Sequence, residues 1–361
     1  MNKLLYLINV NWNWIKQRPQ YLAEAMAMYL EVDVYEKKIY RKHNLVANSI
    51  ERVKLHKLFR LPMQTQFDVI DRINFYLMRR QLLQVIEKYD YIWISNANDY
   101  QLIKDKISNQ KIIYDCMDDY IEFPDVKKDK NKVLEYMRNE HDLLLDSNFV
   151  FTSAEYLKSI ILSRYNDIGN DKINVINNAV TCKLLEQVNS DTLKTKNEKK
   201  VITYIGTISK WINWNFILKS LNMFDNIEYH FWGPKEVDIP QHNGVLYEGI
   251  LPQNQIFTEM RKSDLLIMPF IINELILSVN PVKLYEYILS GVPALACGYS
   301  ETEKFNEFVY LYYNEDDFIH IIKKLSEDVL EVKSNDGFNF VKNNTWESRA
   351  KTIAKIIGEY H

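Results

Sequence analysis

Short apolar runs alternate with segments of helical periodicity along most of the chain, a pattern typical of an α/β protein. The runs are too short for ordinary helices, so each is predicted to be a buried strand. In the first half these strands are 3–9, 32–35, 91–94, 112–114, 148–152 and 174–176. In the second half they are 201–205, 229–232, 245–251, 265–270 and 293–297. Strands that alternate with helices predict parallel sheets of the Rossmann type.

Helical periodicity covers several of the segments between these strands and the end of the chain. The predicted helices are 19–29, 67–89, 135–145, 153–164, 281–290 and 345–360. A polar, charge-rich run from Asn189 to Lys200 has almost no apolar residue to bury, so it is predicted to be a linker between two domains. A chain of 361 residues is long enough for two domains with separate cores.

The helix predicted over 281–290 has an unusual polar content. Asn280 is a good N-cap, Pro281 suits the first helical position, and Gly291 suits the left-handed residue after the helix. Lys283 and the unpaired N–H groups at the helix start would hold an anion. Glu286, one turn further on, would accept hydrogen bonds from sugar hydroxyls. The alternative is an ordinary Lys/Glu pair at i, i+3 on a half-exposed helix.

The loop after the first strand, NVNWNWIKQRPQ, lacks the GxGxxG fingerprint of dinucleotide-binding proteins. It offers instead aromatic and cationic side chains suited to stacking on a sugar and pairing with an acceptor phosphate. Aromatic packing alone is the alternative explanation for the tryptophans. The candidate acceptor-binding residues are Trp12, Trp14, Lys16, Gln17 and Arg18.

Three aspartates, Asp115, Asp118 and Asp119, lie on or just after the strand 112–114. Carboxylates at the carboxyl end of a strand lie where ligands bind in α/β folds. Like charges so close raise the proton affinity of at least one, which suits a general base. The alternative is that Asp118 or Asp119 caps the next helix. The cluster is not a DxD motif, so we predict no metal site.

The second domain has candidate phosphate-binding residues after its first two strands. Gly206 has no side chain, so its backbone can approach a phosphate, and Thr207 and Lys210 follow in the same loop. Trp232 and Gly233 end the next strand. A single glycine is a weak signal by itself. This loop therefore counts as evidence for a phosphate site only together with the helix 281–290.

Composition and charge exclude several classes of protein. The chain is 47% hydrophobic and 26% charged, as folded soluble proteins are, and its net charge of −3 argues against nucleic-acid binding. Its three cysteines form no CxxC pair, which fits a reducing cytoplasm without disulfides or zinc. Asn9 and Asn11 interrupt the first apolar run, so it is predicted to be a strand rather than a signal peptide. No run approaches 18 apolar residues, so no membrane-spanning helix is expected.

The segment 37–60 carries eight Lys/Arg and one acid, Glu51, interleaved with apolar residues. Such a segment is suited to the surface of an anionic bilayer. The alternative is a basic face in contact with water.

Three motifs resemble the GT-B glycosyltransferases, in particular the family-four-like branch that includes the enzymes of teichuronic-acid and exopolysaccharide biosynthesis. The motifs are NPVKLYEY followed by SGVPALA, WxWxKxRPQ, and YDCMDD. The resemblance implies that Glu286 binds the ribose of a nucleotide and that the start of its helix faces the diphosphate. It also implies that Asp119, with Asp118 second, faces the acceptor.

The chain departs from that family at two positions. Ser278 stands where the usual pattern has a glutamate eight residues before Glu286, so Glu274 on the preceding loop is the substitute candidate. Thr207 stands where many relatives have an arginine, and Lys210 or Lys283 is expected to supply that charge. These departures leave open whether the anomeric configuration is retained or inverted.

The resemblance implies two Rossmann-like domains with parallel sheets that face a central cleft. They are an acceptor domain over 1–185 and a nucleotide-sugar domain over 186–345, with a helix over 346–361 that crosses back to the first domain. The implied catalytic residues are Asp119, Asp118 and Glu274. The implied donor-binding residues are Gly206, Thr207, Lys210, Trp232, Gly233, Ser278, Val279, Asn280, Pro281, Val282, Lys283 and Glu286.

The implied reaction moves a sugar from a UDP- or GDP-linked donor to a cell-surface polysaccharide or lipid-linked glycan. It needs no metal and no further cofactor. We expect a cytoplasmic protein, held at the inner face of the membrane if 37–60 binds lipid. The alternatives are a non-catalytic sugar-nucleotide-binding protein that supports a partner enzyme, and a sugar-nucleotide epimerase with the same fold.

Overall fold

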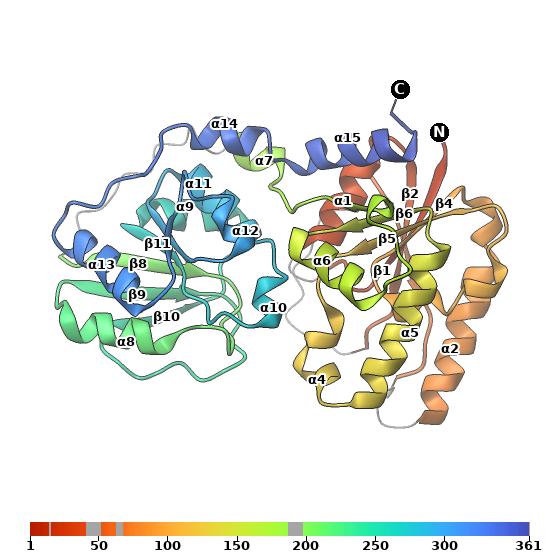
Figure 1. Cartoon of the computed structure of the whole chain (residues 1–361), viewed down its shortest axis with the longest axis horizontal. Helices are drawn as coiled ribbons and strands as arrows, with labels where there is room; N and C mark the ends of the chain where they lie inside the picture. Colours follow the sequence, from red (N-terminus) through yellow and green to blue (C-terminus); the bar gives the residue numbers. More distant parts are fainter. Residues whose placement is uncertain (14–15, 41–51, 63–67, 187–197, 361) are drawn as a thin grey trace. The chain divides into compact units, whose positions relative to one another are not determined.

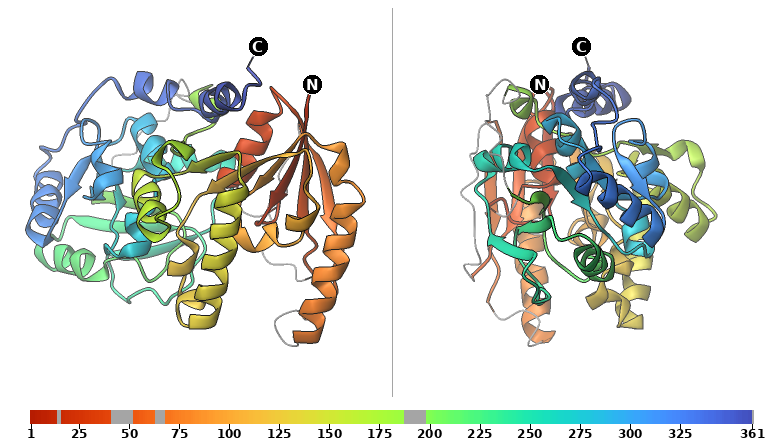
Figure 2. Two further views of the ribbon diagram at one scale, coloured as in Figure 1. Left: turned by 45° about the vertical axis from the view of Figure 1, so that its right-hand side comes forward. Right: turned by 90° about the vertical axis from the view of Figure 1, so that its left-hand side faces the viewer.

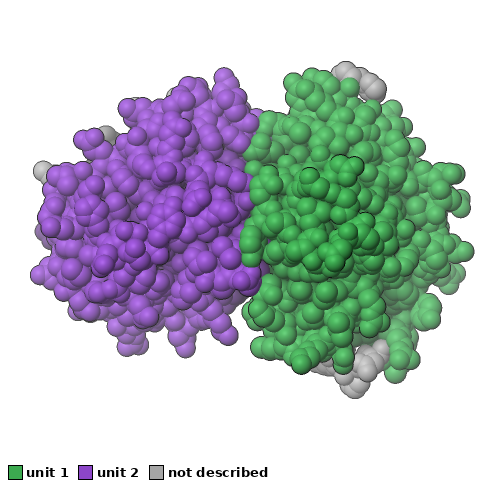
Figure 3. Space-filling view, viewed as in Figure 1, with its two compact units in different colours: residues 1–178, 346–361 green, residues 179–345 purple. Residues whose placement is uncertain are grey.

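The computed structural model describes residues 1–13, 16–40, 52–62, 68–186 and 198–360. The chain forms two compact units, which Figure 3 colours separately. The first contains Met1–Asn178 and Trp346–His361, and the second contains Ala179–Thr345. Most of the predicted linker, 189–200, lies outside the described residues.

The first unit is built on a seven-stranded parallel sheet with the strand order β3-β2-β1-β4-β5-β6-β7. The order reverses between β1 and β4, which places a topological switch point there. The strands are β1 (Lys3–Ile8), β2 (Glu31–Lys37), β3 (Lys54–Leu58), β4 (Tyr91–Ile94), β5 (Lys111–Cys116), β6 (Phe149–Thr152) and β7 (Ile173–Val175).

Helices lie on both faces of this sheet (Figures 1 and 2). The rings of Tyr21 on α1 and Trp346 on α15 stack with centroids 5.5 Å apart, so the end of the chain packs on the first helix. The helices are α1 (Arg18–Met26), α2 (Asp68–Leu83), α3 (Ala97–Tyr100), α4 (Pro124–Lys127), α5 (Lys130–Asp146), α6 (Glu155–Arg164) and α15 (Trp346–Ile357). Short 3₁₀ turns are Ile86–Lys88, Lys104–Lys106, Tyr120–Glu122 and Asn170–Lys172.

Strand β3 was not predicted, because only two of the five residues in its sequence, KLHKL, are apolar. It is the edge strand of the sheet and pairs only with β2 among the described strands. Lys54 forms an ion pair of 2.5 Å with Glu31 on β2, and Leu58 is buried. Part of the basic segment 37–60 is therefore sheet, and residues 41–51 of it lie outside the described ranges.

The second unit contains a six-stranded parallel sheet with the order β10-β9-β8-β11-β12-β13. The strands are β8 (Lys200–Ile205), β9 (Ile227–Trp232), β10 (Val245–Gly249), β11 (Leu265–Met268), β12 (Ala294–Cys297) and β13 (Tyr310–Tyr312). The helices are α7 (Cys182–Leu185), α8 (Trp214–Met223), α9 (Gln253–Lys262), α10 (Glu274–Leu277), α11 (Val282–Ser290), α12 (Ser300–Glu303), α13 (Glu315–Ser326) and α14 (Gly337–Lys342). Two parallel sheets with intervening helices confirm the predicted α/β class.

Candidate functional site

Helix α11 starts without a side-chain cap. Its N-cap residue is Pro281, which has no side-chain acceptor, and Gly291 ends the helix with a φ of 72°. The N-cap residue is therefore Pro281 and not Asn280 as predicted, and the Asn280 amide donates a 2.8 Å hydrogen bond to the buried Glu301 carboxylate. The side chain of the N-cap residue therefore satisfies none of the first N–H groups of α11.

Lys283 and Glu286 form an ion pair on the first turns of α11. The distance from Nζ to Oε2 is 2.9 Å, and the side chains are 33% and 20% exposed. The pair by itself is compatible with both explanations that the sequence left open, an anion site and an ordinary Lys/Glu pair at i, i+3. What distinguishes the anion site is that a half-buried cation lies beside an uncapped helix start, where the helix dipole also favours negative charge.

The loop after β8 and the helix α11 lie at the same edge of the second sheet. Strands β8 and β11 are neighbours, and α11 follows β11, so both connections leave from adjacent carboxyl ends. The Tyr287 hydroxyl on α11 accepts a 3.4 Å hydrogen bond from the N–H of Ile205 and donates one of 3.2 Å to the carbonyl of Ile267. Gly206 directly follows Ile205, so the glycine loop and the helix carrying Glu286 are held together.

Two residues that the sequence analysis missed support the loop before α11. Glu301 is fully buried and also accepts a 2.7 Å hydrogen bond from Lys304, while the Tyr299 hydroxyl donates one of 2.8 Å to the carbonyl of Val279. The only signal in the sequence was a charged SETEK run directly after β12 and its short loop. That run is typical of an exposed helix start, so it gave no reason to place Glu301 in the core.

Ser278 and Glu274 precede Glu286 in the segment that leads to α11. Ser278 is buried, and its hydroxyl donates a 2.7 Å hydrogen bond to the carbonyl of Leu275. Glu274 is exposed in the first turn of the short helix α10, whose N-cap is Asn273. The Ser278 hydroxyl is therefore engaged in a local hydrogen bond. The role predicted for Glu274 requires its exposed side chain to reach the donor sugar.

The remaining predicted donor residues differ in exposure. Trp232 and Thr207 are half-buried, Lys210 is exposed, and the Thr207 carbonyl accepts a 2.9 Å hydrogen bond from Tyr204. Val282 is half-buried at the start of α11. That Lys210 or Lys283 supplies the charge that Thr207 lacks stays a prediction.

The ends of β8 and β9 pass so close that only glycine fits. Gly233 has a φ of 139°, and a Cβ there would lie 2.0 Å from the carbonyl oxygen of Gly206. We expect Gly233→Ala to lower the free energy of unfolding by about 2–3 kcal/mol, because it adds backbone strain and displaces the Gly206 loop. Chemical denaturation measures this loss. Gly249→Ala is the control, because Gly249 has a φ of 90° but a Cβ added there would have no atom within 4 Å, so this variant carries strain without the contact.

Two of the predicted acceptor residues on the loop after β1, Trp12 and Arg18, are internal. Trp12 is completely buried, and its backbone N–H donates a 2.7 Å hydrogen bond to Glu36. The buried Arg18 guanidinium forms a 2.7 Å ion pair with Asp115 and donates a 2.6 Å hydrogen bond to the carbonyl of Ile176. These contacts favour the packing explanation over acceptor binding for Trp12 and Arg18.

The other described residues of this set, Lys16 and Gln17, are more accessible. Lys16 pairs with Glu24 at 2.5 Å and lies over the Tyr21 ring, while Gln17 is exposed and is the N-cap of α1. Trp14 lies outside the described residues. Gln17 is therefore the most accessible member of the set among those that the structure describes.

The aspartates after β5 have different surroundings. Asp119 is buried and forms a 2.7 Å ion pair with Arg164, which also pairs with Glu140 at 3.1 Å. Asp119 precedes the 3₁₀ turn Tyr120–Glu122 but makes no side-chain capping hydrogen bond to it. Asp119 is therefore the anchor of an ion-pair network and not a helix cap.

Asp118 is half-buried, and no hydrogen bond to its carboxylate is found among the described residues. Burial raises the pKa of Asp118 to about 7, an effect that the charge of Arg18 reduces and the charges of Asp115 and Asp119 reinforce. A carboxyl group with this pKa is half-ionised near neutral pH. Asp118 is therefore better suited than Asp119 to exchange a proton with a bound hydroxyl.

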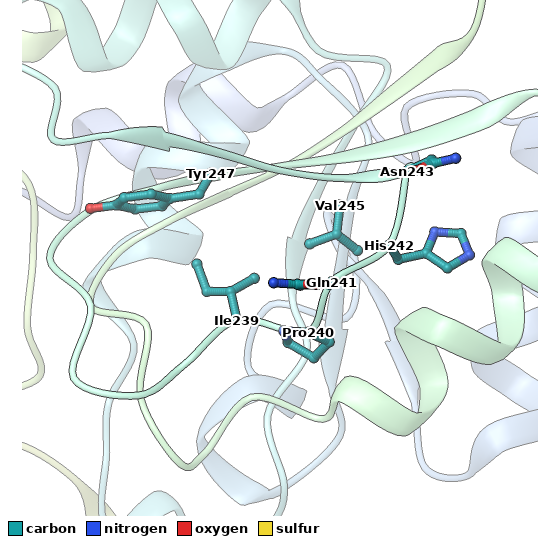
Figure 4. Close-up of a pocket in the computed structure, with 7 residues that line it drawn as sticks. All are labelled: Ile239, Pro240, Gln241, His242, Asn243, Val245 and Tyr247. Atoms are coloured by element: carbon teal, nitrogen blue, oxygen red, sulfur yellow. The ribbon is translucent and has the colours of Figure 1, made fainter.

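A shallow hollow in the second unit does not involve the predicted donor residues. Figure 4 shows its lining, which comes from the loop before β10 and from β10 itself. The lining residues are Ile239, Pro240, Gln241, His242, Asn243, Val245 and Tyr247. The shape of this hollow therefore gives no support to the donor site.

Comparison with known proteins agrees with the resemblance seen in the motifs. No family model matches the chain. It is 21% identical over 279 residues to the putative teichuronic acid biosynthesis glycosyltransferase TuaH of Bacillus subtilis, covering 72% of this chain and 70% of that protein. The predicted resemblance to GT-B glycosyltransferases is thereby confirmed as a distant one.

Solved structures of glycosyltransferases show the same fold along the whole chain. Sucrose-phosphate synthase from Thermosynechococcus elongatus has a TM-score of 0.74 at 12% identity, covering 99% of this chain and 98% of that one. HepE from Anabaena in complex with UDP-glucose has a TM-score of 0.70 at 12% identity, covering 99% and 100%. The chain therefore has the GT-B fold, as the sequence predicted.

Proposed function

We propose that this protein is a glycosyltransferase that takes a sugar from a nucleotide-diphosphate donor bound at the start of α11. The observation that carries the proposal is the uncapped helix start beside the Lys283–Glu286 pair, at the sheet edge that also bears Gly206. The GT-B fold and the similarity to TuaH support it. HepE, a structural neighbour, was solved with UDP and with UDP-glucose, so a UDP-linked donor is the first to test and a GDP-linked donor the second.

In this proposal the diphosphate lies against the N–H groups at the start of α11 and the ammonium of Lys283. Glu286 accepts hydrogen bonds from the two hydroxyls of the nucleotide ribose. Charge builds up on the diphosphate as the glycosidic bond breaks, and these fixed donors stabilise it. The loop at Gly206 lets backbone approach the phosphates, and Asn280 is held in place by Glu301.

On the first unit we propose that Asp118 accepts the proton of the acceptor hydroxyl. The ion pair of Asp119 with Arg164 fixes the backbone on which Asp118 sits. The similarity to TuaH supports a cell-surface polysaccharide or a lipid-linked glycan as acceptor. The three cysteines form no disulfide with one another, which fits reaction in the cytoplasm.

A second candidate is a non-catalytic protein that binds sugar nucleotides for a partner enzyme. It is favoured by Ser278 and Thr207, which put no charge where the resembling enzymes have one, and by the internal hydrogen bond of Ser278. Turnover separates the two candidates, because only the transferase releases nucleotide in the presence of an acceptor.

The experiment that tests the proposal is a thermal-shift screen with nucleotide sugars, followed by a turnover assay. A bound donor raises the melting temperature with the logarithm of its excess over its dissociation constant. We expect one nucleotide class to stabilise the protein and nucleotide release to require an acceptor. Donor consumed without any acceptor, with an isomerised sugar as product, would identify an epimerase instead.

A further inference from the structure

Glu301 is a charged residue that is buried in the second unit. Its side chain is 0% exposed, and its Oε2 atom accepts hydrogen bonds from the Asn280 amide at 2.8 Å and from the Lys304 ammonium at 2.7 Å. A buried carboxylate is costly, and apolar side chains of similar size often replace a buried ion pair without loss of stability. Stability of the fold is therefore a weak reason for a glutamate at this position.

The segment that carries Glu301 is tied to the end of β12. The Thr302 hydroxyl donates a 2.8 Å hydrogen bond to the carbonyl of Cys297, the last residue of β12, and accepts one of 2.9 Å from the N–H of Tyr299. The Tyr299 hydroxyl donates a 2.8 Å hydrogen bond to the carbonyl of Val279. Two adjacent residues before α11, Val279 and Asn280, are thus held by a segment that is fixed to the sheet.

The first turn of α11 has two backbone N–H groups that can receive a ligand. The N–H of Leu284 donates a 3.2 Å hydrogen bond to the carbonyl of Pro281. For the N–H groups of Val282 and Lys283, no acceptor is found in the part of the chain that the structure describes. Pro281, whose ring restricts φ, joins these residues to Asn280. The direction of the two N–H groups therefore depends on how Asn280 is held.

We propose that Glu301 is a positioning residue of the donor site. By fixing Asn280, it orients the N–H groups of Val282 and Lys283 toward the diphosphate. Because its side chain is fully buried, Glu301 acts through Asn280 and not by contact with the donor. Groups that are oriented before binding lose little freedom when the ligand arrives, which favours affinity. Since the same diphosphate site is involved, this inference rests on the proposed function.

The effect of Glu301 should be confined to the phosphates of the ligand. The N–H groups at the helix start face the diphosphate, whereas Glu286 is assigned to the ribose. A nucleoside without phosphates does not contact the helix start, so the ratio of the affinities for UDP and uridine isolates the contribution of Glu301. A merely structural role would lower both affinities together and leave their ratio unchanged.

Binding of UDP and uridine to the full-length protein, measured by calorimetry with competition for the weaker ligand, tests the proposal. Glu301→Leu should bind UDP about tenfold more weakly and uridine as the wild type does. Glu301→Gln keeps an acceptor oxygen for Asn280, so its UDP affinity should stay within about twofold of the wild type. Tyr299→Phe removes the hydrogen bond to Val279 and should also weaken UDP and not uridine. GDP and guanosine take the place of UDP and uridine if the donor is GDP-linked.

Two further variants separate positioning from loss of stability. Ser263→Ala removes a buried 2.6 Å hydrogen bond to Thr203. Ser263 lies before β11 and so near the amino edge of the same sheet, away from α11, and its loss should lower the melting temperature and change neither affinity. Asn280→Ala should weaken UDP binding as Glu301→Leu does. The double variant should bind UDP no more weakly than either single variant, because all three lose the same contact.

Two outcomes overturn the proposal and leave the transferase assignment standing. The first is a folded Glu301→Leu variant that binds UDP as tightly as the wild type. The second is an equal loss of UDP and uridine affinity that accompanies a loss of thermal stability, which would make Glu301 a structural residue. If Glu301→Leu does not fold, Asn280→Ala and Tyr299→Phe decide by the same two criteria. A wild-type protein that binds neither UDP nor GDP overturns the proposed function and the role of Glu301 with it.

Discussion

Replacing Glu286 with alanine is expected to weaken donor binding about 100-fold, because the ribose loses two hydrogen bonds to a charged acceptor. The helix start and Lys283 stay in place, so the diphosphate keeps its contacts. Binding of the nucleotide sugar measured by calorimetry checks this. Turnover at saturating donor should fall much less than the affinity, since the interaction is made in the ground state as well as in the transition state.

A matched control exists within the same unit. Glu259 and Lys262 on α9 form an i, i+3 ion pair of 2.5 Å with comparable exposure, so Glu259→Ala removes the same kind of pair away from the proposed site. Donor affinity should be unchanged in that variant. Glu286→Gln keeps an acceptor at the same position and should lose less than Glu286→Ala. If Glu286→Ala binds the donor as tightly as Glu259→Ala does, then the pair is the ordinary surface pair that the sequence also allowed.

Most strands of both sheets could be predicted from the sequence. Buried parallel strands are apolar on both faces, so runs such as 201–205 and 91–94 stand out from the helices around them. Strand β3 could not be found in that way, because one side of an edge strand is exposed and its lysines are stabilised by a partner such as Glu31, which is distant in the sequence. Strand β13, which was not predicted either, is an edge strand of the second sheet. The fold class depended on the central strands, so neither omission affected it.

The sequence predicted the candidate site less well than the fold, because side-chain roles depend on partners that are distant in the sequence. Asp118 and Asp119 are adjacent and chemically identical, and only the ion pair of Asp119 with Arg164, 45 residues away, separates an anchor from an accessible carboxylate. Arg18 resembled a phosphate ligand because nothing near it in the sequence indicated that Asp115 would bury it. The pairing of Lys283 with Glu286 was easier to predict, because residues three apart on one helix lie on the same side of it.

The second large expected effect is a loss of turnover when Asp118, the more accessible of the two aspartates, is replaced. Asp118→Asn is expected to lower turnover about 100- to 10,000-fold while donor affinity changes little, because an amide cannot accept the proton of the acceptor hydroxyl. In the wild type, turnover should rise with pH up to about 7 and then level off, since only the ionised carboxylate of Asp118 acts as base. The pH profile of the residual turnover of Asp118→Asn should lack this rise.

The same pKa predicts an opposite effect of Asp118→Asn on stability. The pKa of Asp118 is raised from 3.8 to about 7 in the folded protein, so between these values the folded state binds more protons than the unfolded state. The contribution of this group to stability is therefore fully present below pH 3.8 and is lost as the pH rises through 7. Asp118→Asn has no charge to bury, so it should melt at a higher temperature than the wild type above about pH 7 and close to it at about pH 4.

Asp119→Asn breaks a buried ion pair instead and should melt at a lower temperature at neutral pH. A variant of Asp118 that loses both turnover and stability at about pH 8 would show that the carboxylate is structural, and the base would then have to be sought elsewhere on the same sheet edge.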